Sequence, residues 1–252
     1  MIIDADTHIA PTGGEFALEK HLARLDANGI DASLVWLKPD YEGTAIEGHN
    51  RYVYEAARAH PGRVIPFGWA DPTVGVEHAV RMAKTCLTEY GFPGVKMNGA
   101  QNDYYIDDPV LAMPVAEAIA ELGGMIAFHI GPDAYEKTHP LRALRVAERF
   151  PDTIVLLVHM GMTDDAMNEA VVRAAELHRN LYLIGSGTTA ELVHRAIGRL
   201  GAERVLFGSD APFKVVPAAI AMYNALLDAE FSPREKELVM GGNMKRLFGL
   251  ET

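Results

Sequence analysis

Residues 154–159 read Ile-Val-Leu-Leu-Val-His, a run of five apolar residues that ends on a histidine. Three other stretches are built in the same way: residues 2–8 end on His8, residues 125–129 on His129 and residues 205–210 on Asp210. A strand that is buried on both faces of a parallel sheet is apolar throughout. In a β/α barrel, the residue at the end of such a strand points into the active-site mouth. These stretches therefore predict a barrel in which distant segments bring their last residues together.

The alternation of strand and helix patterns extends along the whole chain. Short apolar runs occur near residues 2–5, 32–37, 64–69, 94–97, 125–129, 154–158, 181–184 and 205–208. Helical spacing lies between them, at 15–28, 48–60, 74–90, 110–122, 141–150, 164–178, 189–200 and 217–228, and a last helix is predicted at about 233–248. Eight strand–helix units in 252 residues are typical of one barrel.

No linker or low-complexity segment divides the chain. We therefore predict a single domain over residues 1–252, an α/β protein with a (β/α)8 TIM-barrel fold and an extra C-terminal helix. The longest connections after strands, at 38–47, 98–109 and 130–140, are expected to cover the mouth of the barrel.

Composition narrows the classes of function. The formal net charge is −11, and no cluster of Lys and Arg supplies the basic footprint that nucleic-acid binding needs. Cys86 is the only cysteine, which excludes an intrachain disulfide and a thiolate zinc site.

No apolar stretch is long enough to span a membrane, and the first strand begins too early to leave room for a secretory signal. We expect a cytoplasmic protein that acts on a small molecule. The sequence leaves the oligomeric state open, and a homo-oligomer is compatible with it.

The strand ends predict a metal site. Asp6 and His8 lie on the same side of a strand and can share one divalent ion, although alone they also fit a capping carboxylate and a surface histidine. His129 and His159, taken singly, fit buried core histidines equally well. Asp210 follows an apolar strand, where a carboxylate is rarely buried without a partner. Their combination at the ends of strands one, five, six and eight favours one metal-dependent active site.

Other candidates belong to the same mouth. Lys96 ends the fourth strand, where it could anchor a substrate carboxylate, become a carbamylated ligand between two metals, or pair with a neighbouring acid. Too few histidines and carboxylates surround it for a second metal, so we predict substrate binding. Trp69 ends the third strand and either walls the pocket or belongs to the core. Tyr104, Tyr105 and Lys214 lie in mouth loops. The remaining histidines fall mostly in helices and are expected to be structural or solvated, namely residues 21, 49, 60, 78, 139, 178 and 194.

Further motifs accompany these strand ends. They are Asn50, residues 60–63 with the following 70–72, residues 94–96, residues 108–109, and the closing stretch 242–250. With them, the chain resembles over nearly its whole length the amidohydrolase-related family (amidohydrolase 2) of the amidohydrolase superfamily. This family includes aminocarboxymuconate-semialdehyde decarboxylase and γ-resorcylate decarboxylase.

The resemblance implies a set of roles. The first strand of the family commonly carries two histidine ligands, and here Asp6 and His8 occupy those positions; resorcylate-type members also have a carboxylate at the first one. His129 and Asp210 would complete the ligands of one divalent ion, and His159 would act as acid or base, or polarise the substrate. Mixed nitrogen and oxygen ligands suit Zn²⁺, with Mn²⁺ as the alternative.

The favoured function is a metal-dependent hydrolase for a small carboxylated or cyclic substrate, such as an amide or a lactone. In this mechanism the metal activates a water, Asp210 accepts its proton, and His159 stabilises the oxyanion or protonates the leaving group. The alternative is non-oxidative decarboxylation of an aromatic or muconate-like acid, which needs the same ligands. A metal-free binding protein that keeps the barrel is the rival from another class.

Overall fold

The computed structural model describes residues 1–38 and 45–250, where parallel strands alternate with helices. Most of the predicted connection at 38–47 and the last two residues of the predicted domain lie outside these ranges. Strands β1, β2 and β3 form one parallel sheet, and β4 to β9 form a second one in sequential order. The strands are β1 (Ile3–Ile9), β2 (Ala32–Leu37), β3 (Val64–Pro66), β4 (Gly68–Trp69), β5 (Gly94–Met97), β6 (Met125–His129), β7 (Val155–Val158), β8 (Leu181–Ile184) and β9 (Val205–Leu206).

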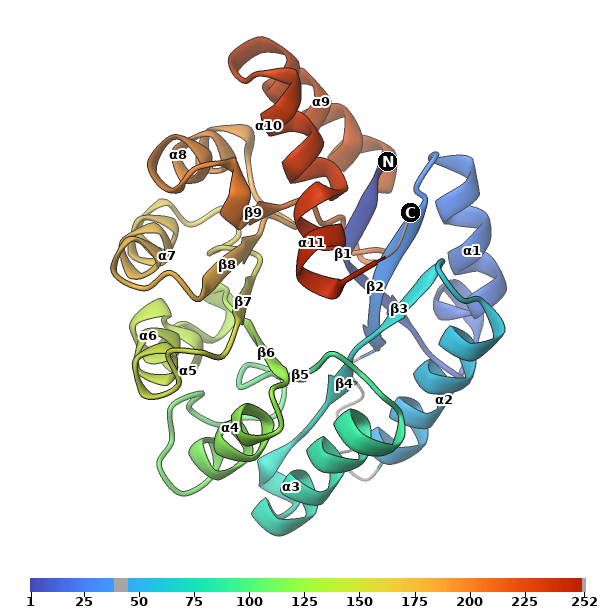
Figure 1. Ribbon diagram of the computed structural model, residues 1–252, viewed down its shortest axis with the longest axis vertical. Coiled ribbons are helices and arrows are strands. Elements are labelled where there is room, and N and C mark those ends of the chain that lie inside the picture. The colour runs from blue at the N-terminus through green and yellow to red at the C-terminus, as the bar shows by residue number, and fades with distance from the viewer. Residues whose placement is uncertain (39–44, 251–252) are drawn as a thin grey trace.

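Helices surround these strands in Figure 1. The α-helices are α1 (Leu18–Ala27), α2 (Ile46–Ala59), α3 (Val76–Lys84), α4 (Ala112–Glu121), α5 (Tyr135–Thr138), α6 (Pro140–Arg149), α7 (Asp165–Leu177), α8 (Ala190–Leu200), α9 (Val216–Glu230), α10 (Pro233–Glu237) and α11 (Asn243–Phe248). Shorter 3₁₀ or π turns are η1 (Gly14–Phe16), η3 (Pro72–Val74), η4 (Thr85–Glu89), η5 (Pro132–Ala134), η6 (Ala202–Arg204) and η7 (Leu238–Gly242).

Backbone hydrogen bonds connect the two sheets at both of their junctions. Only Phe67 separates β3 from β4, and its N–H donates to the carbonyl of Val35 on β2 at 3.0 Å. At the other junction, Ala5 donates to Phe207 at 2.9 Å and His8 donates to Ala211 at 2.8 Å. The strands therefore follow one another around a ring (Figure 1), and the predicted α/β barrel is confirmed.

The apolar runs of the sequence become strands because both of their faces are covered. All four residues of β7 have zero exposure, and each contributes roughly 1.5–3 kcal/mol by leaving water. On α6, Ala143, Val146 and Ala147 face the sheet, whereas Arg145 and Glu148 are exposed. This helical spacing of apolar residues holds the outer layer against the strands. Among the described residues, no helix combines the length and apolar character needed to cross a membrane.

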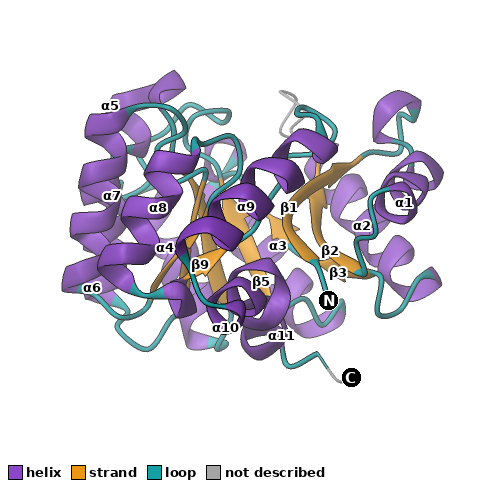
Figure 2. Ribbon diagram, turned by 90° about the horizontal axis from the view of Figure 1, so that it is seen from above, coloured by secondary structure: helices purple, strands orange, loops and turns teal. Residues whose placement is uncertain are grey.

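The C-terminal segment differs from its prediction. The single helix expected at 233–248 is instead α10, the π turn η7 and α11, and Gly241 within the turn is not helical. A Cβ at Gly241 would lie 2.9 Å from the carbonyl oxygen of Met1, so the close approach of the first strand breaks the helix there. Figure 2 places α11 and the N-terminus together at one end of the barrel, opposite the carboxyl ends of the strands.

Candidate active site

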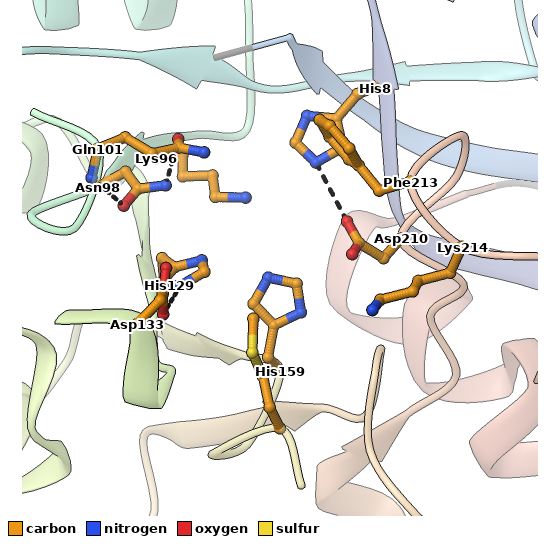
Figure 3. Close-up of a pocket in the computed structure, with 11 residues that line it drawn as sticks. His8, Lys96, Asn98, Gln101, His129, Asp133, His159, Asp210, Phe213 and Lys214 are labelled. Atoms are coloured by element: carbon orange, nitrogen blue, oxygen red, sulfur yellow. Dashed lines mark hydrogen bonds and ion pairs between the residues drawn. The ribbon is translucent and has the colours of Figure 1, made fainter. Parts of the chain in front are cut away.

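A cavity of about 370 Å³ opens at the carboxyl ends of the strands (Figure 3), a size that suits a small molecule. Six residues singled out from the sequence reach it, from β1, β5, β6 and the segments that follow β7 and β9. The lining residues are His8, Lys96, Asn98, Gln101, His129, Asp133, His159, Met162, Asp210, Phe213 and Lys214.

Three of the predicted ligands form one compact group. Ligand atoms of Asp6, His8 and Asp210 all lie within 4.8 Å of one another, and all three side chains are buried. His8 Nε2 is 3.6 Å from Asp6 Oδ1 and 3.7 Å from Asp210 Oδ1. The backbone fixes this arrangement, because the N–H of Asp210 donates to the carbonyl of Asp6 at 2.9 Å.

The donor set fits a divalent cation. His8 Nδ1 lies 2.9 Å from the carbonyl oxygen of Leu37, which can only accept, so Nδ1 carries the proton and Nε2 presents a lone pair. Burial, followed by the charge of Lys96, lowers the pKa of His8 to about 3 and keeps it neutral. Its lone pair then faces two carboxylates, an arrangement that is repulsive unless a cation lies between them. A backbone carbonyl behind a ligating imidazole is also the usual outer partner in metal sites.

Asp210 shows the same need for a cation. Burial, followed by the negative charge of Asp6, raises its pKa to about 8. Both Asp210 and His159 have left-handed backbones, with φ values of 61° and 73°. Such conformations cost roughly 1–3 kcal/mol for residues other than glycine and cluster at functional sites.

Asp6 is held from two sides by hydrogen-bond donors. Trp36 Nε1 donates to its Oδ1 at 2.9 Å, and the Ser186 hydroxyl donates to its Oδ2. Ser186 follows β8 and also contacts His159, whose Nδ1 lies 2.9 Å from the serine Oγ. Neither partner could be predicted from the sequence, because a tryptophan and a serine at strand ends carry no distinctive signal.

His129 reaches the cavity but stands apart from the three-residue group. Its Nε2 lies 2.9 Å from Oδ1 of Asp133, a half-exposed residue of η5, and its ring meets that of His159 edge-on at 4.7 Å. Asp133 lies four residues after His129 in a connection that was predicted to cover the mouth, although the sequence did not single it out.

Lys96 is buried between two tryptophans. Its Nζ lies 3.8 Å from the centroid of the Trp36 ring and 5.3 Å from that of Trp69. Burial lowers the pKa of Lys96 to about 8. Trp69 is not among the described residues that line the cavity: it packs behind Lys96, and its Nε1 donates to Asn102 Oδ1 at 3.0 Å. The core interpretation of Trp69 therefore describes its position better than the pocket-wall one.

Only some of the loop residues predicted at the mouth line the cavity. Of the described residues, Lys214 lines the cavity, whereas Tyr104 and Tyr105 do not. Asn98 could have been found from the sequence, because strand alternation places it on the same side as Lys96. Gln101, Met162 and Phe213 belong to loops whose course the sequence does not reveal.

Burial raises the pKa of Cys86 to about 12, as expected for an inert thiol.

Similarity to known proteins identifies the family of the chain. A family model described as Amidohydrolase matches residues 3–250. The chain belongs to this amidohydrolase family. No curated protein matches the chain significantly.

Solved structures share the fold over nearly the full length. A 2,6-dihydroxybenzoate decarboxylase from Rhizobium is 19% identical with a TM-score of 0.79, and the match covers 100% of this chain and 99% of the other. A dihydroxybenzoic acid decarboxylase from Polaromonas sp. JS666, with bound manganese and 2-nitroresorcinol, is 20% identical with a TM-score of 0.77 and coverages of 99% and 97%. An uncharacterised TIM-barrel protein from Bordetella bronchiseptica is 18% identical with a TM-score of 0.79 and coverages of 98% and 99%.

Proposed function

We propose that this amidohydrolase-family protein is a metal-dependent decarboxylase that removes CO₂ from a small aromatic or muconate-like acid. The observation that carries the proposal is the pairing, at one cavity, of a buried ligand group with a buried ammonium. Asp6, His8 and Asp210 supply the ligands, and Lys96 supplies a cation that suits a substrate carboxylate. The sequence favoured hydrolysis, whereas the similarity to two decarboxylases supports the alternative.

The cofactor in this proposal is one divalent ion. Asp6, His8 and Asp210 would hold it, and His129, whose Nε2 now contacts Asp133, would be a fourth ligand. When bound, the ion supplies a Lewis acid that orients and polarises the substrate carboxylate and an adjacent oxygen. The ligand types suit Zn²⁺, but the manganese in the Polaromonas decarboxylase supports Mn²⁺.

Three side chains would bind the substrate and transfer protons in this reaction. Lys96 binds the carboxylate that is lost. Asp210 would hold the ion and would also deliver a proton to the ring carbon. A C–H bond forms there, the C–C bond to the carboxylate breaks, its electron pair restores the ring, and CO₂ leaves; a proton from solvent then returns to Asp210. His159 handles a second proton, at an oxygen beside the reacting carbon.

Product analysis tests the proposal. Protein loaded with Mn²⁺ or with Zn²⁺ is incubated separately with carboxyl-¹³C-labelled hydroxybenzoates and with a panel of lactones and amides. We expect labelled CO₂ from at least one hydroxybenzoate, about one metal per chain, and no activity in the ligand variant His8→Asn. Release of acid from lactones or amides without any CO₂ would establish the hydrolase instead. Full activity in a metal-free preparation would contradict both.

A further inference from the structure

Ser186 joins two residues that have different roles in the proposed reaction. Its Oγ donates a hydrogen bond to Asp6 Oδ2 and lies 2.9 Å from His159 Nδ1. Its own carbonyl oxygen lies 3.2 Å from the same Nδ1. All three side chains are buried, so no water competes strongly for these contacts. One serine thus contacts a metal-ligand candidate and a proton-transfer candidate together.

The direction of each hydrogen bond follows from the acceptors present. A carboxylate that binds metal is ionised and can only accept, so the single hydroxyl proton of Ser186 goes to Asp6. The Ser186 carbonyl can also only accept, and the serine Oγ has a free lone pair. Both oxygens that face His159 Nδ1 are therefore acceptors, which requires the imidazole proton to sit on Nδ1.

The opposite tautomer fits these contacts poorly. With its proton on Nε2, the lone pair of His159 Nδ1 would face the carbonyl oxygen of Ser186. The hydroxyl of Ser186 could relieve this only by turning to His159, which would remove one of the two donors that hold Asp6. The tautomer with Nδ1–H satisfies all of these groups together.

We propose that Ser186 is a positioning residue: with Asp6, it holds His159 as the Nδ1–H tautomer, so that Nε2 faces the cavity as a proton acceptor. Figure 3 shows the second ring nitrogen of His159 directed into the space between His129 and Asp210. Within the proposed decarboxylation, on which this step rests, Nε2 takes the proton of a substrate hydroxyl while the ring carbon is protonated. It returns that proton to the oxygen after CO₂ has left, so the histidine is unchanged overall.

The tautomer can be measured without any substrate. ¹⁵N-labelled protein is loaded with diamagnetic Zn²⁺, and its histidine ring nitrogens are observed by long-range ¹H–¹⁵N correlation; the signals that vanish in His159→Asn are assigned to His159. We expect a protonated Nδ1 and an unprotonated Nε2. A proton on Nε2 in the Zn²⁺-loaded wild type would overturn the proposal.

Kinetics of Ser186→Ala supply the second readout. We expect kcat to fall roughly 10- to 100-fold, as for other outer partners of an active-site group, with KM and metal content unchanged. The backbone carbonyl of residue 186 still accepts from Nδ1 in this variant, so the loss reports the positioning of the ring by the hydroxyl. Ser33→Ala is the matched control. Ser33 lies on β2, does not line the cavity, and makes another buried serine–histidine hydrogen bond, with 2.9 Å between its Oγ and His21 Nε2. We expect this variant to keep the kcat of the wild type.

The tautomer measurement and the kinetics together distinguish a failure of the proposed function from a failure of the proposed role of Ser186. The expected tautomer in a protein that releases no CO₂ from any acid would overturn the proposed function and support the role of Ser186. A wild-type kcat in Ser186→Ala would overturn that role even if the protein is a decarboxylase.

Discussion

The two sides of the cavity are built differently. On the side of β9 and β1, Asp6, His8 and Asp210 come from adjoining backbone segments that hydrogen-bond to each other, and their ligand atoms are already grouped within 4.8 Å. On the side of β6, His129 ends a strand, but its Nε2 is engaged by Asp133 from a short turn. Sheet pairing thus brings three candidate ligands together, whereas the fourth candidate, His129, is held by a loop residue.

The strength of these two arrangements differs accordingly. The group on β9 and β1 is buried, and its backbone cannot shift without disturbing the ring of strands. The Asp133 side chain is 49% exposed. A contact of that kind is worth about 0.2–1 kcal/mol, which a metal–nitrogen bond easily exceeds. We therefore expect His129 to exchange its partner when metal binds, while the other three residues stay in place.

The largest effect is expected on the preassembled side. Asp210→Asn removes a ligand charge and the proposed proton carrier together, so the activity should fall by on the order of 10⁴-fold or more, and the bound metal should be lost. Metal analysis and kcat measure this. Asp107→Asn, which changes a carboxylate paired with Arg142 and Arg145 outside the cavity, is the control. Full metal content in Asp210→Asn would show that Asp6 and His8 suffice without it.

Variants of His129 and His159, on the other side of the cavity, should distinguish metal binding from proton transfer. His159→Asn should keep its metal and its melting temperature while losing on the order of 10²–10⁴ in kcat, the usual contribution of a positioned proton-transfer group. His129→Asn should lose metal and activity together. Titration of both variants with Mn²⁺ or Zn²⁺ decides the matter. Equal loss of metal in the two would make His159 a ligand.

Lys96 tests whether the cavity recognises a carboxylate. Lys96→Met should raise KM roughly 10- to 100-fold, because a hydrogen bond to a charged group is worth about 1.5–3 kcal/mol, and metal content should not change. Loss of metal in this variant would instead support a carbamylated lysine.

The wild-type pH profile follows from the same residue. An ammonium is charged below its pKa, and burial lowers the pKa of Lys96 to about 8. KM for an anionic substrate should therefore be lowest below pH 8 and rise as the pH increases through that value, by up to about tenfold per pH unit. This rise should be absent from Lys96→Met. A rise of equal size in that variant would assign the pH dependence to another group.

The smallest effect concerns the turn that engages His129. Asp133→Ala removes the competing hydrogen bond, so metal affinity should increase about 2- to 5-fold, in line with the modest energy of an exposed pair. Calorimetric titration of metal-free protein measures it, with wild type and His129→Asn in parallel. A weaker affinity in Asp133→Ala would mean that Asp133 supports the metal rather than competing with it.

The sequence predicted what strand patterning controls. Seven of the predicted apolar runs each correspond to one strand, and the third, at 64–69, is interrupted only at Phe67. His8, Lys96 and Asp210 reach the cavity because a residue at the carboxyl end of a barrel strand has little choice of direction.

What the sequence did not predict depends on side-chain contacts between loops. Ser186 becomes informative only when its distances to Asp6 and His159 are known. Asp133 reaches His129 because of the path that η5 takes. For Trp69 the sequence allowed both a pocket wall and a core position, and its contact with Asn102 distinguishes the two. The break in the last helix depends on the approach of Met1 to Gly241, a contact between the two ends of the chain.

That contact between the ends also bears on how the protein is made. One edge of β1 pairs with β2, but the other is covered by Phe207 and Ala211 and by the turn η7. Synthesis proceeds from the N-terminus, so these partners leave the ribosome about 200 residues after the strand that needs them. During that interval β1 presents a free, apolar edge that can pair with other chains. Asp4 and Asp6 place carboxylates in the middle of this strand, and charge within an unpaired strand opposes pairing with other chains. We therefore expect Asp6, a proposed metal ligand, also to discourage misassembly of the nascent chain.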